Sequence, residues 1–178
     1  MAVLGCVSAR RPDTRPRIPI GYRTVSPQQA AEYNSNGRLS YNPLRSAREQ
    51  LGPGVYTTPG PGQWAGKPED WLVHCLITGL ENEIKFMDEV WIPRDYWWNA
   101  RAMFEYVEEN FEDVNLDYAM RLSRVDEHED ITQLLIPDHL VIEYSALFQV
   151  ICKQDWRNLP HTSEVKYSSW DNVHGTPQ

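Results

Sequence analysis

Cysteine is scarce in this sequence: Cys6, Cys75 and Cys152 are the three in 178 residues. Their odd number and wide spacing predict neither a disulfide framework nor a zinc ribbon, and they fit a reducing compartment. Arg10 and Arg11 follow soon after the first apolar residues, so that apolar run is too short for the apolar segment of a signal peptide. No apolar run reaches the length that crosses a bilayer. We therefore expect a cytoplasmic protein with no membrane segment.

Several motifs that carry chemistry are also missing. The chain has no glycine-rich phosphate loop of the Walker or dinucleotide type, and no G-x-S-x-G elbow of a serine hydrolase. The five histidines form neither an H-E-x-x-H motif nor a pair with a cysteine, so we expect no metal. The formal net charge of −8 argues against binding to the phosphate backbone of a nucleic acid.

The composition is that of a globular domain, with 41% hydrophobic and 24% charged residues. Seven Trp and nine Tyr supply many amphipathic rings, which typically line a small-molecule cleft and would equally serve the interface of a homodimer. We expect a flexible Arg- and Pro-rich arm over residues 1–19, one domain over residues 20–156, and a polar tail over residues 157–178.

The order of the expected elements favours an α+β fold. A short strand over residues 19–25 precedes a helix that Ser26 and Pro27 begin and Gly37 ends. Apolar spacing predicts one long amphipathic helix over residues 97–111. The remaining elements are mostly strands, with a solvated turn at the acidic residues 126–130, and they are expected over residues 55–58, 71–77, 85–93, 118–122, 132–136 and 146–152.

Three pieces of the sequence resemble the ADP-ribosyltransferase superfamily, especially its enterotoxin-like, arginine-type branch. They are Gly-Tyr-Arg-Thr-Val-Ser-Pro at residues 21–27, Leu-Gly-Pro-Gly-Val-Tyr-Thr-Thr at residues 51–58, and Thr-Gln-Leu-Leu-Ile-Pro at residues 132–137. The resemblance covers roughly residues 20–152 and implies a split β-sheet core. The spacing and order also resemble those of small fungal proteins of this fold.

The resemblance implies NAD as the ligand and assigns roles to the first two pieces. Arg23 would grip the NAD pyrophosphate or ribose, because a guanidinium offers a fixed fork to phosphate oxygens. Tyr56 and Thr57 would line the nicotinamide pocket, and Tyr22 and Thr58 are further residues expected to bind the cofactor. The alternatives are a structural salt bridge for Arg23 and simple β-propensity for the two threonines.

The third piece departs from the family at its catalytic residue. The resemblance expects Glu where Gln133 stands, and Ile131 occupies the position two residues earlier. An amide carries no charge to stabilise the oxocarbenium-like centre that forms as nicotinamide leaves. Glu127 and Glu129 are the nearest carboxylates, but a strand would carry Glu129 roughly 13 Å from Gln133 at about 3.3 Å per residue.

Three functions therefore stay open. The first is an NAD glycohydrolase or mono-ADP-ribosyltransferase with an altered site. The second is a repurposed fold that isomerises, cyclises, dehydrates or hydrolyses another small molecule, as in fungal secondary metabolism. The third is a non-catalytic interaction module. The second needs a group that transfers protons near neutral pH, and the candidates are Asp70, His74, Glu127, His128 and Glu129.

Overall fold

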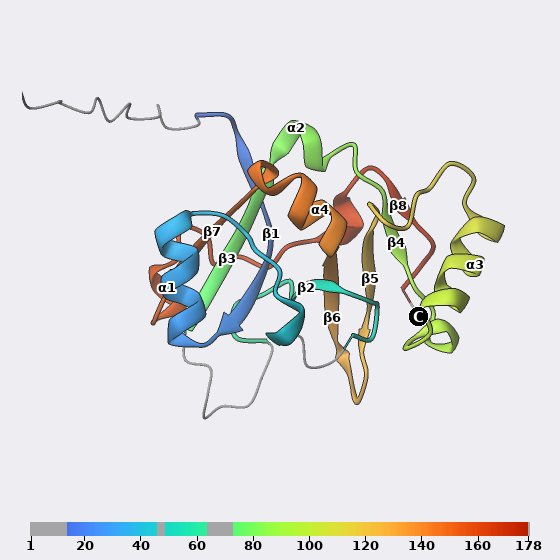
Figure 1. Cartoon of the computed structure of the whole chain (residues 1–178), viewed down its shortest axis with the longest axis horizontal. Helices are drawn as coiled ribbons and strands as arrows, with labels where there is room; N and C mark the ends of the chain where they lie inside the picture. The colour runs from blue at the N-terminus through green and yellow to red at the C-terminus, as the bar shows by residue number, and fades with distance from the viewer. Residues whose placement is uncertain (1–13, 46–48, 64–72, 178) are drawn as a thin grey trace, which may run out of the picture.

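Two β-sheets form the centre of the protein, whose computed structural model describes residues 14–45, 49–63 and 73–177 (Figure 1). One sheet has three antiparallel strands in the order β1 (Arg17–Val25), β3 (Val73–Leu80) and β7 (Phe148–Lys153). The other has five strands in the order β2 (Gly54–Thr57), β6 (His128–Pro137), β5 (Met120–Val125), β4 (Glu89–Trp91) and β8 (Val173–His174). Its β2, β6 and β5 are antiparallel, whereas β4 is parallel to β5 and β8.

Four α-helices accompany the sheets in the part of the chain that the structure describes. They are α1 (Pro27–Asn36), α2 (Glu81–Ile84), α3 (Ala100–Asn110) and α4 (Asp138–Glu143). Short 3₁₀ turns are η1 (Pro43–Arg45), η2 (Arg94–Tyr96), η3 (Ser145–Leu147), η4 (Trp156–Asn158) and η5 (Tyr167–Ser169). In Figure 1, α1 lies beside the three-stranded sheet and α3 lies beyond β4 at the far end of the molecule. The prediction of a mixed α+β fold is confirmed.

Helix α1 forms as its capping residues predict. The Ser26 hydroxyl accepts a hydrogen bond from the Gln29 amide at 3.2 Å, which satisfies one of the free N–H groups of the first turn. Gly37 ends the helix in the left-handed conformation with φ of 63°, and its N–H donates to the Tyr33 carbonyl. The helix buries Ala30 and Tyr33.

Helix α3 is shorter than the apolar spacing predicts. It begins at Ala100, where the Asn99 side chain accepts from the Ala102 amide at 3.1 Å, and it buries Met103 and Val107. Phe104, expected on the buried face, is 51% exposed. Trp97 stands before the helix, where its indole N–H donates to the Ile92 carbonyl.

The two sheets meet where Tyr22 of β1 pairs with Thr58, just past β2. Each of these residues donates its backbone N–H to the other's carbonyl at 2.8 Å. Gly21 makes this approach possible, because a Cβ at that position would stand 2.4 Å from the Thr57 Oγ1. This backbone pair therefore holds β1 against the residue that follows β2.

Buried side chains form three clusters that cover the sheets. The largest joins both sheets with α1 and α4 and includes Leu134 and Ile136 of β6. The second lies under α3 and includes Leu135, which points to the opposite face of β6. The third joins Tyr22 and Leu76 to Leu159 near the C-terminus.

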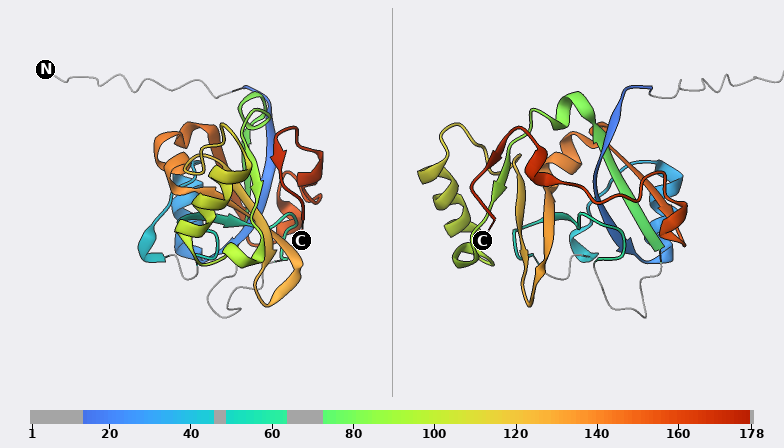
Figure 2. Two further views of the ribbon diagram at one scale, coloured as in Figure 1. Left: turned by 90° about the vertical axis from the view of Figure 1, so that its right-hand side faces the viewer. Right: turned by 180° about the vertical axis from the view of Figure 1, so that it is seen from behind.

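The segment over residues 157–177 is a folded part of the domain, so its expected role as a polar tail is wrong. Leu159 and Tyr167 are buried, and the Tyr167 hydroxyl donates to the Ile20 carbonyl at 3.0 Å. The right-hand view of Figure 2 shows this segment crossing the back of the molecule before it reaches β8. A few widely spaced apolar side chains anchor the segment, and such spacing gives no periodic signal in the sequence.

Two other expectations need correction. The strand predicted over residues 85–93 is reduced to β4 at Glu89–Trp91, and the expected arm is shorter because β1 already begins at Arg17. Of the strand predicted over residues 71–77, the first two residues lie outside the described part of the chain.

Cys75 and Cys152 form a disulfide, contrary to the expectation that the cysteines stay unpaired. They are register partners on the adjacent strands β3 and β7, although 77 positions separate them along the chain. Sequence spacing could not reveal this strand pairing. Since structural disulfides are rare in reducing compartments, the cysteines no longer favour a reducing compartment for this protein. Within the described residues, no helix is long and apolar enough to span a membrane.

Candidate functional site

The three pieces that resemble an ADP-ribosyltransferase lie side by side in the structure. The first forms β1 and the start of α1, the second forms β2, and the third forms the end of β6. Tyr22 pairs with Thr58, which joins the first piece to the second. The Thr57 hydroxyl donates to the Leu134 carbonyl at 3.3 Å, and Tyr56 pairs with Leu135, which joins the second to the third.

Arg23 lies on β1 directly opposite Cys75, beside the disulfide. Its side chain is half-buried, and its Nε is buried with no hydrogen-bond partner among residues 14–45, 49–63 and 73–177. A buried guanidinium nitrogen without a partner carries a free-energy penalty that a bound anion would relieve. Arg23 therefore keeps an unsatisfied donor on β1, one residue after Tyr22, which joins the two sheets.

Tyr22 points to the opposite face of β1 from Arg23, because successive side chains of a strand alternate. Its ring packs with Leu76 and Leu159, and its hydroxyl donates to the Ser163 carbonyl at 2.9 Å. Burial raises the pKa of Tyr22. The C-terminal segment thus covers the face on which Tyr22 lies.

Tyr56 packs into the cluster under α3. Its hydroxyl accepts from the Leu51 amide at 2.8 Å and donates to the Gly52 carbonyl at 2.8 Å, and burial raises its pKa. Thr57 and Thr58 are buried, and the Thr58 hydroxyl donates to backbone carbonyls. The ring and both hydroxyls therefore already have protein contacts.

Gln133 belongs to a buried network of amides on the β5–β6 hairpin. Its side chain is 1% exposed, and its Nε2 donates to the Ser123 hydroxyl at 3.1 Å and the Arg124 carbonyl at 3.3 Å. The Gln50 amide donates to the same two acceptors, and its Oε1 accepts from the Asp126 N–H. The position where the resemblance expects a catalytic Glu thus stabilises the hairpin. Gln50 was not predicted, because nothing in its local sequence marks it.

Glu127 and Glu129 lie at the tip of the same hairpin. Glu127 occupies the turn with φ of 65° and is exposed. Glu129 is also exposed, and its carboxylate pairs with the Arg94 guanidinium, which stands 3.8 Å from an Asp126 oxygen. Both carboxylates lie on the surface, whereas Gln133 is buried.

A cavity of about 190 Å³ lies beside Glu129, between the end of β4 and the β5–β6 hairpin. Its lining residues are Trp91, Ile92, Arg94, Trp97, Arg124 and Glu129. A larger depression of about 650 Å³ lies at the end of α1, lined by Ser35, Asn36, Arg38, Leu39, Ser40 and Ser145. Neither Arg23 nor Tyr56 lines either hollow.

The two histidines proposed for proton transfer lie on different elements, His74 on β3 and His128 at the start of β6. His74 is half-buried on β3, where burial lowers its pKa against the opposing effect of Asp155, and His128 is exposed. Asp70 lies outside the described residues. In the described part of the chain, no group of three or more His, Cys, Asp or Glu is arranged to hold a metal ion.

Glu89 is a buried carboxyl that sequence reasoning missed. It lies on β4 with 1% exposure, and neither of its side-chain oxygens has a hydrogen-bond partner among the described residues. Burial, with smaller effects of Asp88 and Asp171, raises its pKa to about 9. The one available signal was a carboxylate directly before the short apolar run Val90-Trp91-Ile92.

Comparison with known proteins gives a family but no activity. A search of curated proteins found no match. A family model described as a family of unknown function (DUF5910) matches residues 49–176. The match includes β2, the β5–β6 hairpin and the cavity beside Glu129, and it leaves out β1 and α1. Because it spans well over half of the chain, the protein belongs to the DUF5910 family.

Proposed function

We propose that this protein is an ADP-ribosyltransferase-like domain that binds NAD near Arg23 and does not cleave it by the carboxylate route. The convergence of the three resembling pieces at one sheet junction carries this proposal. Tyr22, Thr58 and Leu134 come from distant parts of the sequence and are linked there by hydrogen bonds through the second piece. The resemblance assigns NAD contacts to the first two pieces and the catalytic residue to the third.

Arg23 supplies the chemistry for the dinucleotide. Its Nε is buried and has no partner in the described residues, so a phosphate oxygen would satisfy a donor that the fold leaves unsatisfied. The pyrophosphate of NAD is the part of the ligand that a guanidinium holds best, because two oxygens match the two nitrogens of its fork.

Gln133 explains why we expect binding without turnover. Its amide is neutral, is 1% exposed, and already donates to Ser123 and Arg124. Charge that develops on the ribose therefore has no anion at this position to stabilise it. Glu129 does not substitute for it, because its carboxylate is paired with Arg94.

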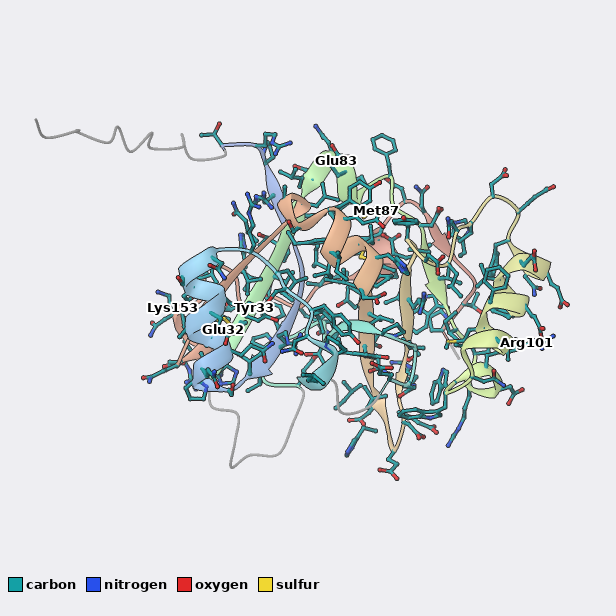
Figure 3. All side chains as sticks on the ribbon, in the orientation of Figure 1. Glu32, Tyr33, Glu83, Met87, Arg101 and Lys153 are labelled. Carbon is teal, nitrogen blue, oxygen red and sulfur yellow. A yellow bond between two sulfur atoms is a disulfide. The ribbon has the colours of Figure 1, made fainter. Side chains whose placement is uncertain are left out.

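Calorimetric titration with NAD and with ADP-ribose tests the proposal. We expect both to bind, and we expect Arg23→Gln to weaken each by about tenfold or more, the typical loss of a charge-assisted contact. Arg101→Gln is the matched control, because Figure 3 shows Arg101 on α3 at the opposite end of the molecule from α1. Circular dichroism would check that each variant is folded.

Two outcomes would overturn this function. The first is the absence of NAD binding at millimolar concentration in the folded parent protein. The second is an equal loss of affinity in Arg23→Gln and Arg101→Gln. Rapid release of nicotinamide would leave the binding part intact and refute the statement about turnover.

A further inference from the structure

The cavity beside Glu129 is built from three separate parts of the chain. Trp91 is the last residue of β4, and Ile92 follows it. Arg94 lies in the 3₁₀ turn η2, and Trp97 is the residue after that turn. Arg124 and Glu129 come from the β5–β6 hairpin. Figure 1 shows the end of β4 next to this hairpin, and the Ile92 N–H donates to the Leu122 carbonyl at 2.8 Å.

The volume of this cavity limits its ligand. At about 190 Å³ it is slightly larger than the roughly 150 Å³ cavity that holds a benzene molecule in another protein. Pockets for drug-sized ligands measure about 300–1,000 Å³. A single ring with one small substituent fits the space.

Two of the residues that line the cavity are tryptophans, Trp91 and Trp97. Trp91 is almost fully buried in the main core, so its ring is fixed by packing. Trp97 is held by its indole N–H, which donates to the Ile92 carbonyl at 2.9 Å. Since that N–H is already used, Trp97 offers the ligand its ring rather than a hydrogen bond.

The charges of the lining favour an anion. The Arg94 guanidinium is neutralised by Glu129 and lies 5.8 Å from the centre of the Trp97 ring. Arg124 has a different environment: its Nη1 donates to the neutral Thr132 hydroxyl at 2.8 Å, and no ion pair of Arg124 occurs within the described residues. Arg124 is therefore the cation of the lining that has no carboxylate partner in the described part of the chain.

We propose that this cavity binds a small planar carboxylate, a single aromatic ring that bears one carboxyl group. The carboxylate lies against Arg124, where the guanidinium fork matches its two oxygens. The ring lies against the indole walls, which supply stacking and apolar contact. This site does not depend on NAD binding, because it shares no residue with Arg23 and its surroundings.

Titration with benzoate, followed by the NMR signal of the Trp97 indole N–H and by calorimetry, tests the proposal. Benzamide keeps the ring without the charge, and acetate keeps the charge without the ring. We expect benzoate to bind with millimolar or better affinity and to shift the Trp97 signal. We expect each comparison compound to bind at least about tenfold more weakly, since charge and ring both contribute.

Three variants locate the binding. Arg124→Gln and Trp97→Leu are expected to weaken benzoate by about tenfold or more. Arg157→Gln is the matched control, because the Arg157 guanidinium also stands over an indole, 4.9 Å from the Trp156 ring centre, and pairs with Asp155. It lines no part of the cavity, and we expect it to bind benzoate like the parent.

The proposal is refuted if benzoate leaves the Trp97 signal unchanged at its solubility limit. It is also refuted if benzamide binds as tightly as benzoate, or if Arg157→Gln weakens binding as much as Arg124→Gln does. Should Trp97→Leu fail to fold, Trp97→Phe keeps a ring in the wall and is expected to retain part of the affinity.

Discussion

Glu89 has the most strongly shifted carboxyl pKa in the described part of the chain. Its side chain lies on β4 in the core, with both oxygens buried and without hydrogen-bond partners among those residues. Burial raises its pKa to about 9 from 4.5, with added repulsion from Asp88 and Asp171. The carboxyl is therefore protonated in the folded protein at neutral pH, whereas it is ionised in the unfolded chain.

The first prediction follows from this pKa shift. Because the folded-state pKa is raised, the stability that the protonated carboxyl contributes is complete below pH 4.5 and is lost as the pH rises to about 9. Glu89→Gln keeps the shape of the protonated acid but cannot ionise. Relative to the parent, this variant should gain on the order of 4 kcal/mol of unfolding free energy between about pH 5 and pH 8, at about 1.4 kcal/mol for each pH unit between the two pKa values.

Urea unfolding at the two pH values measures this gain. Glu83→Gln serves as the control, because Glu83 is exposed on the surface of α2, where Figure 3 labels it. A Glu89→Gln variant whose stability differs from that of the parent by the same amount at both pH values would contradict the shifted pKa.

The second prediction concerns the amide of Gln133. Gln133→Glu places a carboxylate beside the Arg124 carbonyl, where the native amide donates a hydrogen bond. A buried carboxylate facing an acceptor loses both its hydration and the hydrogen bond. We expect this variant to lose about 3 kcal/mol or more of unfolding free energy at neutral pH.

Lowering the pH tests the cause of that loss. If the new charge is responsible, acid should protonate the carboxyl and restore part of the stability, whereas Gln133→Leu should show a smaller loss that is insensitive to pH. If the two variants lose the same stability and respond to pH in the same way, the hydrogen bonds of Gln133 do not account for the loss.

At the residue scale, local chemistry was predictable and long-range burial was not. The hydroxyl of Ser26 caps α1 as its sequence context predicts, because a cap depends on neighbours three residues away. The partners of Gln133 depend instead on strand pairing and on Gln50, which is far away in the sequence. Gln133 was a catalytic candidate because it stands where the resembling motif has its catalytic residue. The place of a residue in a motif does not reveal whether its side chain is buried.

The third prediction compares two glycines, one at the start of β2 and one at the end of α1. Gly54 begins β2 with φ of 147°, and a Cβ there would stand 2.3 Å from the Ile136 carbonyl oxygen of β6. Gly37 ends α1 with φ of 63° and has open space around the same position. Gly37→Ala should therefore cost about 1 kcal/mol, whereas Gly54→Ala should cost more than about 2 kcal/mol because it also separates two strands.

Urea midpoints of the two variants measure the difference, and each serves as a control for the other. Both substitutions add the same methyl group at a positive φ, and only the one at Gly54 brings that methyl group against another strand. Similar midpoints would contradict the close contact between β2 and β6.

Periodic elements were predictable, and aperiodic ones were not. The apolar spacing predicted α3, and the acidic turn separated the two strands that became β5 and β6. The segment over residues 157–177 was missed because β8 is only two residues long. Its anchors, Leu159 and Tyr167, make contacts with other parts of the chain that no local pattern encodes.

At the scale of the whole molecule, two links join parts that are distant in sequence. The backbone pair of Tyr22 and Thr58 connects the two sheets. The disulfide of Cys75 and Cys152 connects β3 to β7 inside the three-stranded sheet and closes a loop across 77 positions of the chain. That loop contains β4, β5 and β6, so the disulfide restricts the unfolded chain over much of the five-stranded sheet.

The fourth prediction is that reduction of this disulfide destabilises the whole domain. In the chain-entropy account, closing a loop of this length contributes roughly 4 kcal/mol, and measured effects are often lower. We expect a reductant, or the double substitution Cys75→Ala and Cys152→Ala, to lower the unfolding free energy by about 2–4 kcal/mol. A Cys6→Ala background removes the third thiol, so that exchange with Cys6 cannot disturb the measurement.

Thiol counting decides whether the link exists in the purified protein. In the Cys6→Ala background, the unfolded protein should show no reactive thiol before reduction and should gain both Cys75 and Cys152 as thiols after it. If both thiols react without a reductant, the link is absent, and the reductant should then leave the urea midpoint unchanged. If the link is present but reduction leaves the midpoint unchanged, the pairing of β3 with β7 alone already holds the sheet at its full stability.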